Sequence, residues 1–549
     1  MARRPTVSLT LLILACPFFQ LSGHETSRRA FQLARQLAQS QAAATAEDAE
    51  QIRKLPQCRL LIDVVDAESQ QSVPAVVRII NAETGKAIPL FGEIHRGLNW
   101  YSLDAKSTIS LPQMKLKIEA LRGLDTTQTT RVIDLREQAK SSITIPLHRF
   151  YAARFRGLRS GNTHLHLMKL THEEAIRYLR VVPQSDDLDL VFLSHLRRIP
   201  DERHYISNRI VEESFTGGNL QRLSQHGVLL GGGEEHRHNF GRGGEGYGHV
   251  MLLDIAKLIR PVSLGPGIMR DGTDGIPLRR GIREARAEEA TVIWCHNDFG
   301  MEDLPNWLAG LVHAQNIFDG SERGSYEDSF YRYLNLGMRV PFSTGTDWFI
   351  YDFARVYVPV DGELTTATWL SGLRNGKSFI TNGPLLELES ERAHVGETLD
   401  LTGPNEVTFV ARGMGRRDFK ALELVCNGKV VHRVETVPHE GYFVAEMRHG
   451  LQISEPGWVA VRVPREAGQS ELGRQLFAHT SPIYIAVAGK QIFRADVAKA
   501  MIDELTASKQ TIGKKGVFAD ALARQGIMQI YDDAIADLAR QIKHHDKQD

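Results

Sequence analysis

The chain has 549 residues, which at roughly 150 residues per domain predicts three or four structural units rather than one core. Lys plus Arg and Asp plus Glu both number 66, so the net charge gives no reason to expect nucleic acid or an anionic membrane as a partner. The four cysteines lie far apart and form no CxxC pair, which argues against a disulfide framework and against a thiolate zinc site. The 21 histidines raise the question of a metal site, because imidazole is a common ligand.

Residues 1–23 have the features of a secretory signal peptide. Two arginines precede the apolar stretch Thr6–Ala15, which is too short to span a bilayer, and Ser22-Gly23 supplies small residues for cleavage. We therefore expect export to the periplasm, the cell surface or the extracellular space. Cys16 loosely resembles a lipoprotein acylation site, so a lipid anchor is an alternative, and an uncleaved anchor is another. No later segment has the roughly 20 apolar residues of a transmembrane helix.

The rest of the chain divides by its hydrophobic patterns. Residues 24–56 are rich in Ala, Gln, Arg and Glu and predict a helical spacer. Short strand-like runs separated by turn residues predict a β-sandwich over 57–150 and a second one over 384–490. Between them, over 151–383, apolar strands alternate with helical stretches, which favours an α/β fold with a largely parallel sheet or barrel. Residues 491–549 have helical periodicity and predict a helical tail that is solvated or docked on a partner.

Titratable side chains recur where the central strands end. His164 and His166 lie two residues apart, so on a strand they share one face and can bind one ion together. By itself this pair is a weak signal, because surface or core histidines also occur at this spacing. Four further apolar strands end in titratable residues, namely in His195, in Glu234-Glu235, in His296 and in Asp347. Active sites of β/α barrels are built where strands end, so this recurrence predicts a ligand set, with hydrogen-bonded strand caps as the alternative.

The order of these motifs resembles a known family. HxH at 164–166, the strand ending in His195, GxE at 233–235 with GHV at 248–250, the strand ending in His296, and GTD at 345–347 together resemble the PHP (polymerase and histidinol phosphatase) superfamily of metallohydrolases. The likeness covers about residues 155–383 and is greatest to the exported branch of the carbaryl-hydrolase type (CehA/McbA-like). It implies a distorted (β/α)7 barrel with two or three metal ions at its mouth, here flanked by two β-sandwich domains.

The resemblance also implies roles for individual residues. Glu235 would bridge two metal ions, although Glu234, His236 and His238 lie close enough in sequence to replace an assigned ligand. The first metal is assigned to His164, His166 and Asp347, and the second to His249 and His296. His172 stands where the family often places a third-site Asp or His, and His195 matches the histidine of the family's strand-end TDH motif.

Two departures from the family pattern change this expectation. Asn162 stands where the family usually has Asp, and Phe349 stands where the fourth motif usually ends in His. Phenylalanine cannot bind a metal, so the sequence predicts two divalent ions, of zinc, manganese or iron, and leaves the third site in doubt. His172 and His195 would then be free to act in catalysis, as a general acid or as a donor to a substrate anion.

Arginines near the assigned ligands indicate an anionic small-molecule substrate. The candidates are Arg197, Arg237 and Arg355, whose planar guanidinium groups suit phosphate or carboxylate, although ion pairing with neighbouring acids is an equally good explanation. The leading interpretation is an exported hydrolase that uses a metal-bound hydroxide on a phosphoester, with carbamate, ester or amide as second choices, and with Asp347, His172 and His195 as catalytic residues. The alternative is a non-catalytic, metal-containing surface protein that binds glycans or a protein partner.

Overall fold

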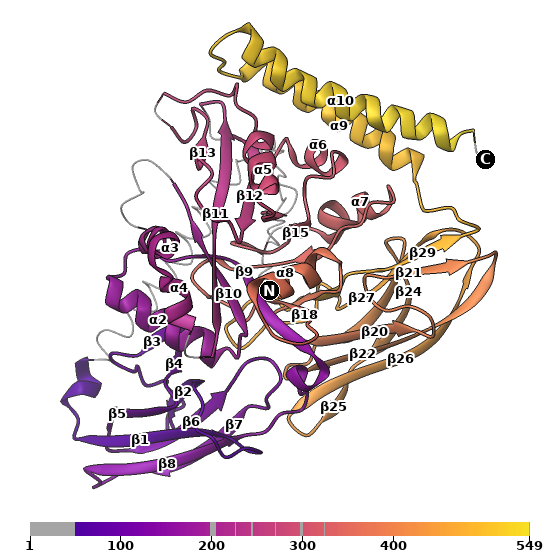
Figure 1. Ribbon diagram of the computed structural model, residues 1–549. Helices are drawn as coiled ribbons and strands as arrows, with labels where there is room; N and C mark the ends of the chain where they lie inside the picture. Colours follow the sequence, from indigo (N-terminus) through magenta and orange to yellow (C-terminus); the bar gives the residue numbers. More distant parts are fainter. Residues whose placement is uncertain are drawn as a thin grey trace, which may run out of the picture.

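The structure is a computed structural model that describes residues 50–197, 205–224, 227–242, 245–269, 271–296, 300–322 and 324–547. It is a mixed α/β fold with one strongly curved sheet and several smaller sheets (Figure 1). The predicted signal peptide, Cys16 and most of the predicted spacer lie outside the described residues. None of the helices in the described ranges combines the length and apolarity needed to cross a bilayer.

The first part of the described chain consists of two sheets that share one hydrophobic core. Side chains along β1 alternate between buried and more exposed, as expected for a strand with one face on a core. Buried residues from both sheets belong to the same apolar cluster. One sheet has the order β5 (Lys106–Pro112), β1 (Gln57–Asp66), β8 (Lys140–Leu147), and the other has the order β3 (Ile94–Gly97), β4 (Trp100–Leu103), β2 (Ala75–Asn81), β6 (Lys115–Leu121), β7 (Thr129–Asp134).

The central curved sheet is mixed, whereas the sequence predicted a largely parallel one. Only residues 241–244 separate β11 from β12, too few for the crossover that a parallel pair needs, so these strands pair antiparallel. Two runs of neighbouring strands are parallel. The first run is β9 (Leu158–His166), β10 (Leu190–His195) and β11 (Leu229–Phe240), and the second is β14 (Thr291–Trp294), β15 (Ala314–Asn316) and β16 (Phe342–Ser343). Between the runs, β12 (Glu245–Leu253) is antiparallel to β11 and β14, while β13 (Ser263–Leu264) and β17 (Asp347–Trp348) pair parallel with β11 and β9.

Helices of the central part pack against these strands. The longest of them, α2, begins with a capping box: the Thr171 hydroxyl accepts the Glu174 N–H, and the Glu174 carboxylate accepts the Thr171 N–H. The described helices are α2 (His172–Ser185), α3 (Ile206–Gly217), α4 (Asn219–Leu223), α5 (Leu278–Ala287), α6 (Asp303–Leu308), α7 (Arg332–Leu334) and α8 (Thr366–Arg374), with the short turns η1 (Ala153–Arg156) and η4 (Glu327–Tyr331).

The curved sheet continues into the strands that follow residue 383. β19 (Phe379–Thr381) pairs on one side with β18 (Arg355–Pro359), itself antiparallel to β9, and on the other with β28 (Ala478–Thr480). Beyond β28 the strands are β27 (Gly457–Arg462), β23 (Ala421–Cys426), β24 (Lys429–Glu435), β29 (Ile483–Val487) and β21 (Thr398–Leu401). A further sheet, in the order β20 (Leu385–Ser390), β22 (Asn405–Gly415), β26 (Tyr442–Ile453), β25 (Val437–His439), shares their core.

The predicted helical tail is a docked helical hairpin. α9 (Ala495–Lys515) and α10 (Ala521–His545) lie side by side along one edge of the molecule (Figure 1, yellow). Buried Leu505 and Leu538 belong to the same apolar cluster as Trp294 of β14. At the turn between the helices, the Val517 N–H donates to the Asp274 carboxylate at 2.7 Å, and the Asp274 N–H donates to the Val517 carbonyl at 2.7 Å. The hairpin therefore completes the central core.

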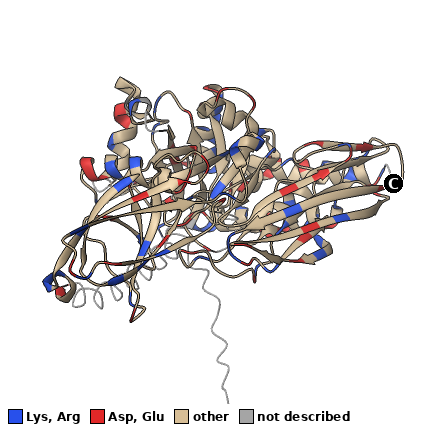
Figure 2. Ribbon diagram, turned by 90° about the horizontal axis from the view of Figure 1, so that it is seen from below, with Lys and Arg blue, Asp and Glu red and all other residues tan. Residues whose placement is uncertain are grey.

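Charged residues are spread over the whole chain. Figure 2 shows Lys and Arg interspersed with Asp and Glu along the sheets and helices. This distribution agrees with the formal net charge of zero.

Candidate metal centre

His164 and His166 project together from the end of β9. Their Nε2 atoms are 3.1 Å apart, close to the separation of about 3.3 Å expected for two nitrogens on one tetrahedral ion. The other ring nitrogens are held from behind: His164 Nδ1 is 2.9 Å from Asp319 Oδ2, and His166 Nδ1 is 2.9 Å from the Ser194 carbonyl oxygen. Hydrogen bonds of this kind fix the tautomer that leaves Nε2 free to bind a metal.

Glu235 on β11 lies between two pairs of histidines. Its Oε2 is 3.0 Å from His166 Nε2, whereas its Oε1 is 2.9 Å from His249 Nδ1 and 3.4 Å from His296 Nε2. Burial would raise the pKa of this carboxyl, but the hydrogen bonds to the three histidines outweigh it and hold the pKa well below its usual value. A buried carboxylate that directs each oxygen at a different histidine pair has the geometry of a bridging ligand.

Asp347 completes the first group. Its Oδ1 lies 3.4 Å from His164 Nε2 and 3.7 Å from His166 Nε2. Within the described part of the chain this buried oxygen has no hydrogen-bond partner, which is costly unless a cation lies beside it. Burial raises the pKa of Asp347 to about 6. The preceding Gly345 allows the close approach, because a Cβ there would lie 2.5 Å from the Cβ of His164.

His249 and His296 form the second pair. His249 Nε2 is 3.2 Å from Asn239 Oδ1, and burial lowers the pKa of His249 to about 4, which keeps the imidazole in the neutral form that binds metals. His296 follows β14, with Nδ1 3.2 Å from the Asp319 carbonyl oxygen. Burial would lower the pKa of His296, but the charge of Asp319 and the hydrogen bond to Glu235 raise it to about 10.

The structure brings all six ligands assigned from the sequence into one cluster, in which His296 is partly exposed and the other five are buried. It also adds Asp319, which the sequence analysis missed. Asp319 follows the apolar residues Ile317 and Phe318 after β15, so it has the same strand-end signal as the other ligands, but β15 has only three residues and is hard to recognise. The ligand atoms form three overlapping groups that could hold a metal ion, namely His164, His166, Glu235 and Asp347; His164, His296 and Asp319; and Glu235, His249 and His296.

The alternative ligands on β11 point to the opposite face of the strand. Glu234 Oε1 is 2.9 Å from His236 Nδ1, and its Oε2 accepts the Ile259 N–H at 2.9 Å. His238 Nε2 is 3.3 Å from Asp274 Oδ1. Because side chains alternate along a strand, Glu235 joins the cluster and Glu234 does not.

The predicted catalytic histidines lie outside the three groups. His172 is the first residue of α2, with a side chain 43% exposed and Nε2 3.8 Å from Glu213 Oε2. His195 is buried at the end of β10, with Nε2 3.0 Å from Glu212 Oε1. Phe349 contributes its ring to an apolar cluster against Tyr178, with centroids 5.6 Å apart. The catalytic roles of the two histidines therefore remain predictions.

The three predicted substrate-binding arginines differ in their surroundings. Arg237 is buried on the same face of β11 as Glu235, and its Nη2 donates to the Arg197 carbonyl at 3.3 Å. Arg355 is buried on β18 and donates to the backbone carbonyls of Phe353 and Asp186 at 2.9 and 2.7 Å. Arg355 therefore links the segment before β18 to the end of α2, while Arg237 adds positive charge beside the cluster.

Comparison with known proteins adds no relative. No protein-family profile matches the sequence, and no curated protein matches it significantly. The likeness to the PHP superfamily thus rests on the order of the motifs alone.

Proposed function

We propose that this protein is an exported, PHP-like metal-dependent hydrolase that holds two divalent ions and acts on a phosphoester, with carbamate, ester or amide as second choices. The observation that carries the proposal is the Glu235 carboxylate, whose oxygens lie 3.0 Å from His166 Nε2 and 2.9 Å from His249 Nδ1. A buried carboxylate between two imidazole pairs is the arrangement that a bridged pair of ions needs.

The donor set fits such ions. Imidazole nitrogens with carboxylate oxygens suit zinc, manganese or iron. Asp347 Oδ1, which accepts no hydrogen bond from the described residues, offers a further anionic donor. A pair of ions bound here would lower the pKa of a shared water and stabilise the charge that develops on the attacked oxygen.

The residues around the cluster would orient the ligands and the substrate. Asp319 and the Ser194 carbonyl hold the rings of His164 and His166, and Asn239 holds His249. Arg237, whose charge helps to lower the pKa of His249, would attract the anionic group of the substrate. His195 would serve as the general acid, and its contact with Glu212 at 3.0 Å would keep it oriented.

The test is turnover of chromogenic phosphomonoesters and phosphodiesters by metal-depleted protein reconstituted with Mn²⁺ or Zn²⁺. We expect metal-dependent hydrolysis that falls at least about a hundredfold in His164→Ala, since even residues that only support a ligand cost 10–100-fold. The matched control is His439→Ala, an exposed histidine on β25. Turnover that is absent on every ester, or unchanged in His164→Ala, would contradict the proposal and favour a metal-containing binding protein.

A further inference from the structure

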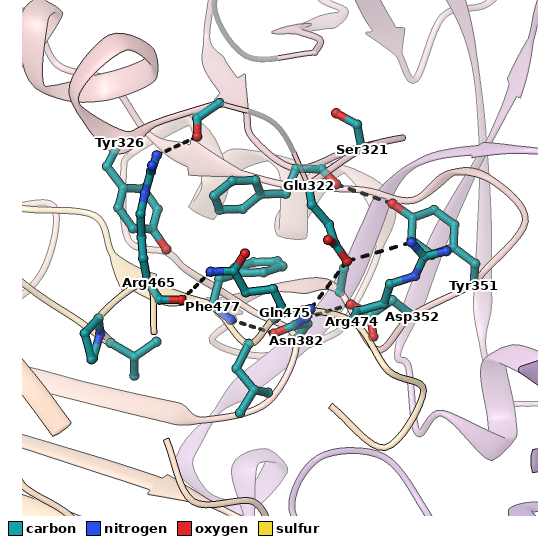
Figure 3. A pocket seen from close by; sticks show the side chains of 16 residues that line it. Ser321, Glu322, Tyr326, Tyr351, Asp352, Asn382, Arg465, Arg474, Gln475 and Phe477 are labelled. Carbon is teal, nitrogen blue, oxygen red and sulfur yellow. Dashed lines mark hydrogen bonds and ion pairs between the residues drawn. The ribbon is translucent and has the colours of Figure 1, made fainter. Parts of the chain in front are cut away.

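A separate pocket lies where the loop after β15 meets the connection between β27 and β28 (Figure 3). Its volume is about 180 Å³, and none of the candidate metal-binding residues lines it. Ser321 lines this pocket, whereas the neighbouring Gly320 contacts the metal cluster, because a Cβ there would lie 2.5 Å from Asp347 Oδ2. The pocket and the metal cluster are thus on opposite sides of one loop.

Aromatic side chains form much of the pocket wall. The rings of Phe318 and Phe477 have centroids 4.9 Å apart, and those of Phe318 and Tyr326 have centroids 5.8 Å apart. Tyr351 lies on the opposite side in Figure 3. A cavity of about 150 Å³ lined by apolar residues can hold benzene. The space here therefore suits one six-membered ring with a small substituent.

The polar side of the pocket carries the guanidinium group of Arg474. The Arg474 guanidinium lies 4.6 Å from the Tyr351 ring centroid and 3.8 Å from Glu322 Oε1, which is too far for a hydrogen bond. Among the residues that the structure describes, this guanidinium donates no hydrogen bond. Both acids that line the pocket have partners. Asp352 accepts from Asn382 Nδ2 at 2.7 Å and from Ser470 Oγ at 3.1 Å, and Glu322, the ion-pair partner of Arg474, accepts the Gln475 N–H at 3.4 Å.

We propose that this pocket binds a single-ring aromatic carboxylate. The ring would pack against Phe318, Tyr326 and Phe477, and the carboxylate would bond to Arg474, whose planar fork matches it in a bidentate manner. Arg465 lies at the other end of the lining and donates to the Gly324 carbonyl at 2.6 Å. It would therefore contribute positive charge rather than a second bidentate contact to the carboxylate. This site goes beyond the proposed hydrolase activity and does not depend on it.

The experiment is ¹⁹F NMR titration of the full chain with 4-fluorobenzoate after metal removal with EDTA. We expect a dissociation constant on the order of 0.1–1 mM, as for a ligand of this size. Arg474→Gln should weaken binding about tenfold, since it removes a charge-assisted pair. Arg417→Gln, an exposed arginine outside the pocket, is the matched control and should leave binding unchanged.

Related probes separate the alternatives. 4-Fluorobenzyl alcohol should bind more weakly than 4-fluorobenzoate, and a naphthoate should fail to enter. Equal or tighter binding of 4-fluorobenzylamine would overturn the charge argument, because it would show that Glu322 rather than Arg474 selects the ligand. Binding that is lost on EDTA treatment, or in His164→Ala, would place the carboxylate on the metal cluster and overturn the proposal. Binding that persists in inactive His164→Ala protein would support the pocket independently of the hydrolase.

Discussion

Asp319→Asn tests whether the carboxylate behind His164 sets the tautomer of that ring. Three donors converge on Asp319: Oδ2 lies 2.9 Å from His164 Nδ1 and 3.0 Å from Asn316 Nδ2, and Oδ1 accepts the His296 N–H at 3.0 Å. An amide has one acceptor oxygen, so its NH₂ group must face at least one of these donors. If it faces His164, the ring relaxes to the tautomer with the proton on Nε2, the atom that would otherwise bind metal.

The expected magnitude follows from this loss of orientation. Removing such a partner usually weakens metal binding 10–100-fold, or about 1.4–2.7 kcal/mol. Metal-depleted protein titrated with Zn²⁺ or Mn²⁺ against a chromophoric chelator would measure the change. Asp303→Asn is the matched control, since Asp303 is equally buried, accepts from the Tyr333 hydroxyl at 2.6 Å, and lies outside the cluster. Affinity within threefold of wild type in a folded Asp319→Asn protein would refute the reasoning, as would equal weakening in the control.

Three further predictions concern packing and pH. Gly345→Ala should weaken metal binding at least about tenfold, because its Cβ would press on His164, whereas Gly403→Ala, with nothing within 4 Å, should match wild type in the same titration. Leu538→Ala should lower the free energy of unfolding by about 2–5 kcal/mol in urea, and a change below about 0.5 kcal/mol would show that α10 is not part of the core. Burial lowers the pKa of His479 to about 3, so between pH 6.5 and 3 the unfolded chain binds more protons than the folded one and the free energy of unfolding should fall as the pH falls, by about 2–3 kcal/mol at pH 4.5. His479→Gln should flatten this part of the pH profile, and an unchanged slope would contradict the assignment.

The candidate site was predictable because strand-end residues carry a local signal. His164 and His166 share a face by the two-residue period of a strand, and His296 and Asp347 follow short apolar runs. The same period could not decide between Glu234 and Glu235, since either face of β11 is buried and a one-residue shift exchanges them. Asp319 was not predicted because β15 is too short to show the two-residue period of a strand.

The pairing of the strands could not be predicted from the sequence. The mixed α/β character and the helical tail followed from alternating hydrophobic patterns, but the antiparallel β11–β12 pair did not. Both strands continue through polar residues, so the connection between them is shorter than the apolar runs indicate. The pairing of β19 with β28 joins residues about 100 positions apart, so no local sequence pattern indicates it. The amphipathic pattern of α9 and α10 predicted helices without identifying the surface that they cover.

The contact between Asp274 and Val517 bears on how the chain reaches this structure. Their paired hydrogen bonds at 2.7 Å join positions 243 residues apart, and α10 adds apolar side chains to the core around Trp294. During synthesis the N-terminal sheets can form early, but the central part cannot bury its last apolar face until α9 and α10 have emerged. Late completion keeps this apolar surface of the central part open to chaperones until the helical hairpin has docked.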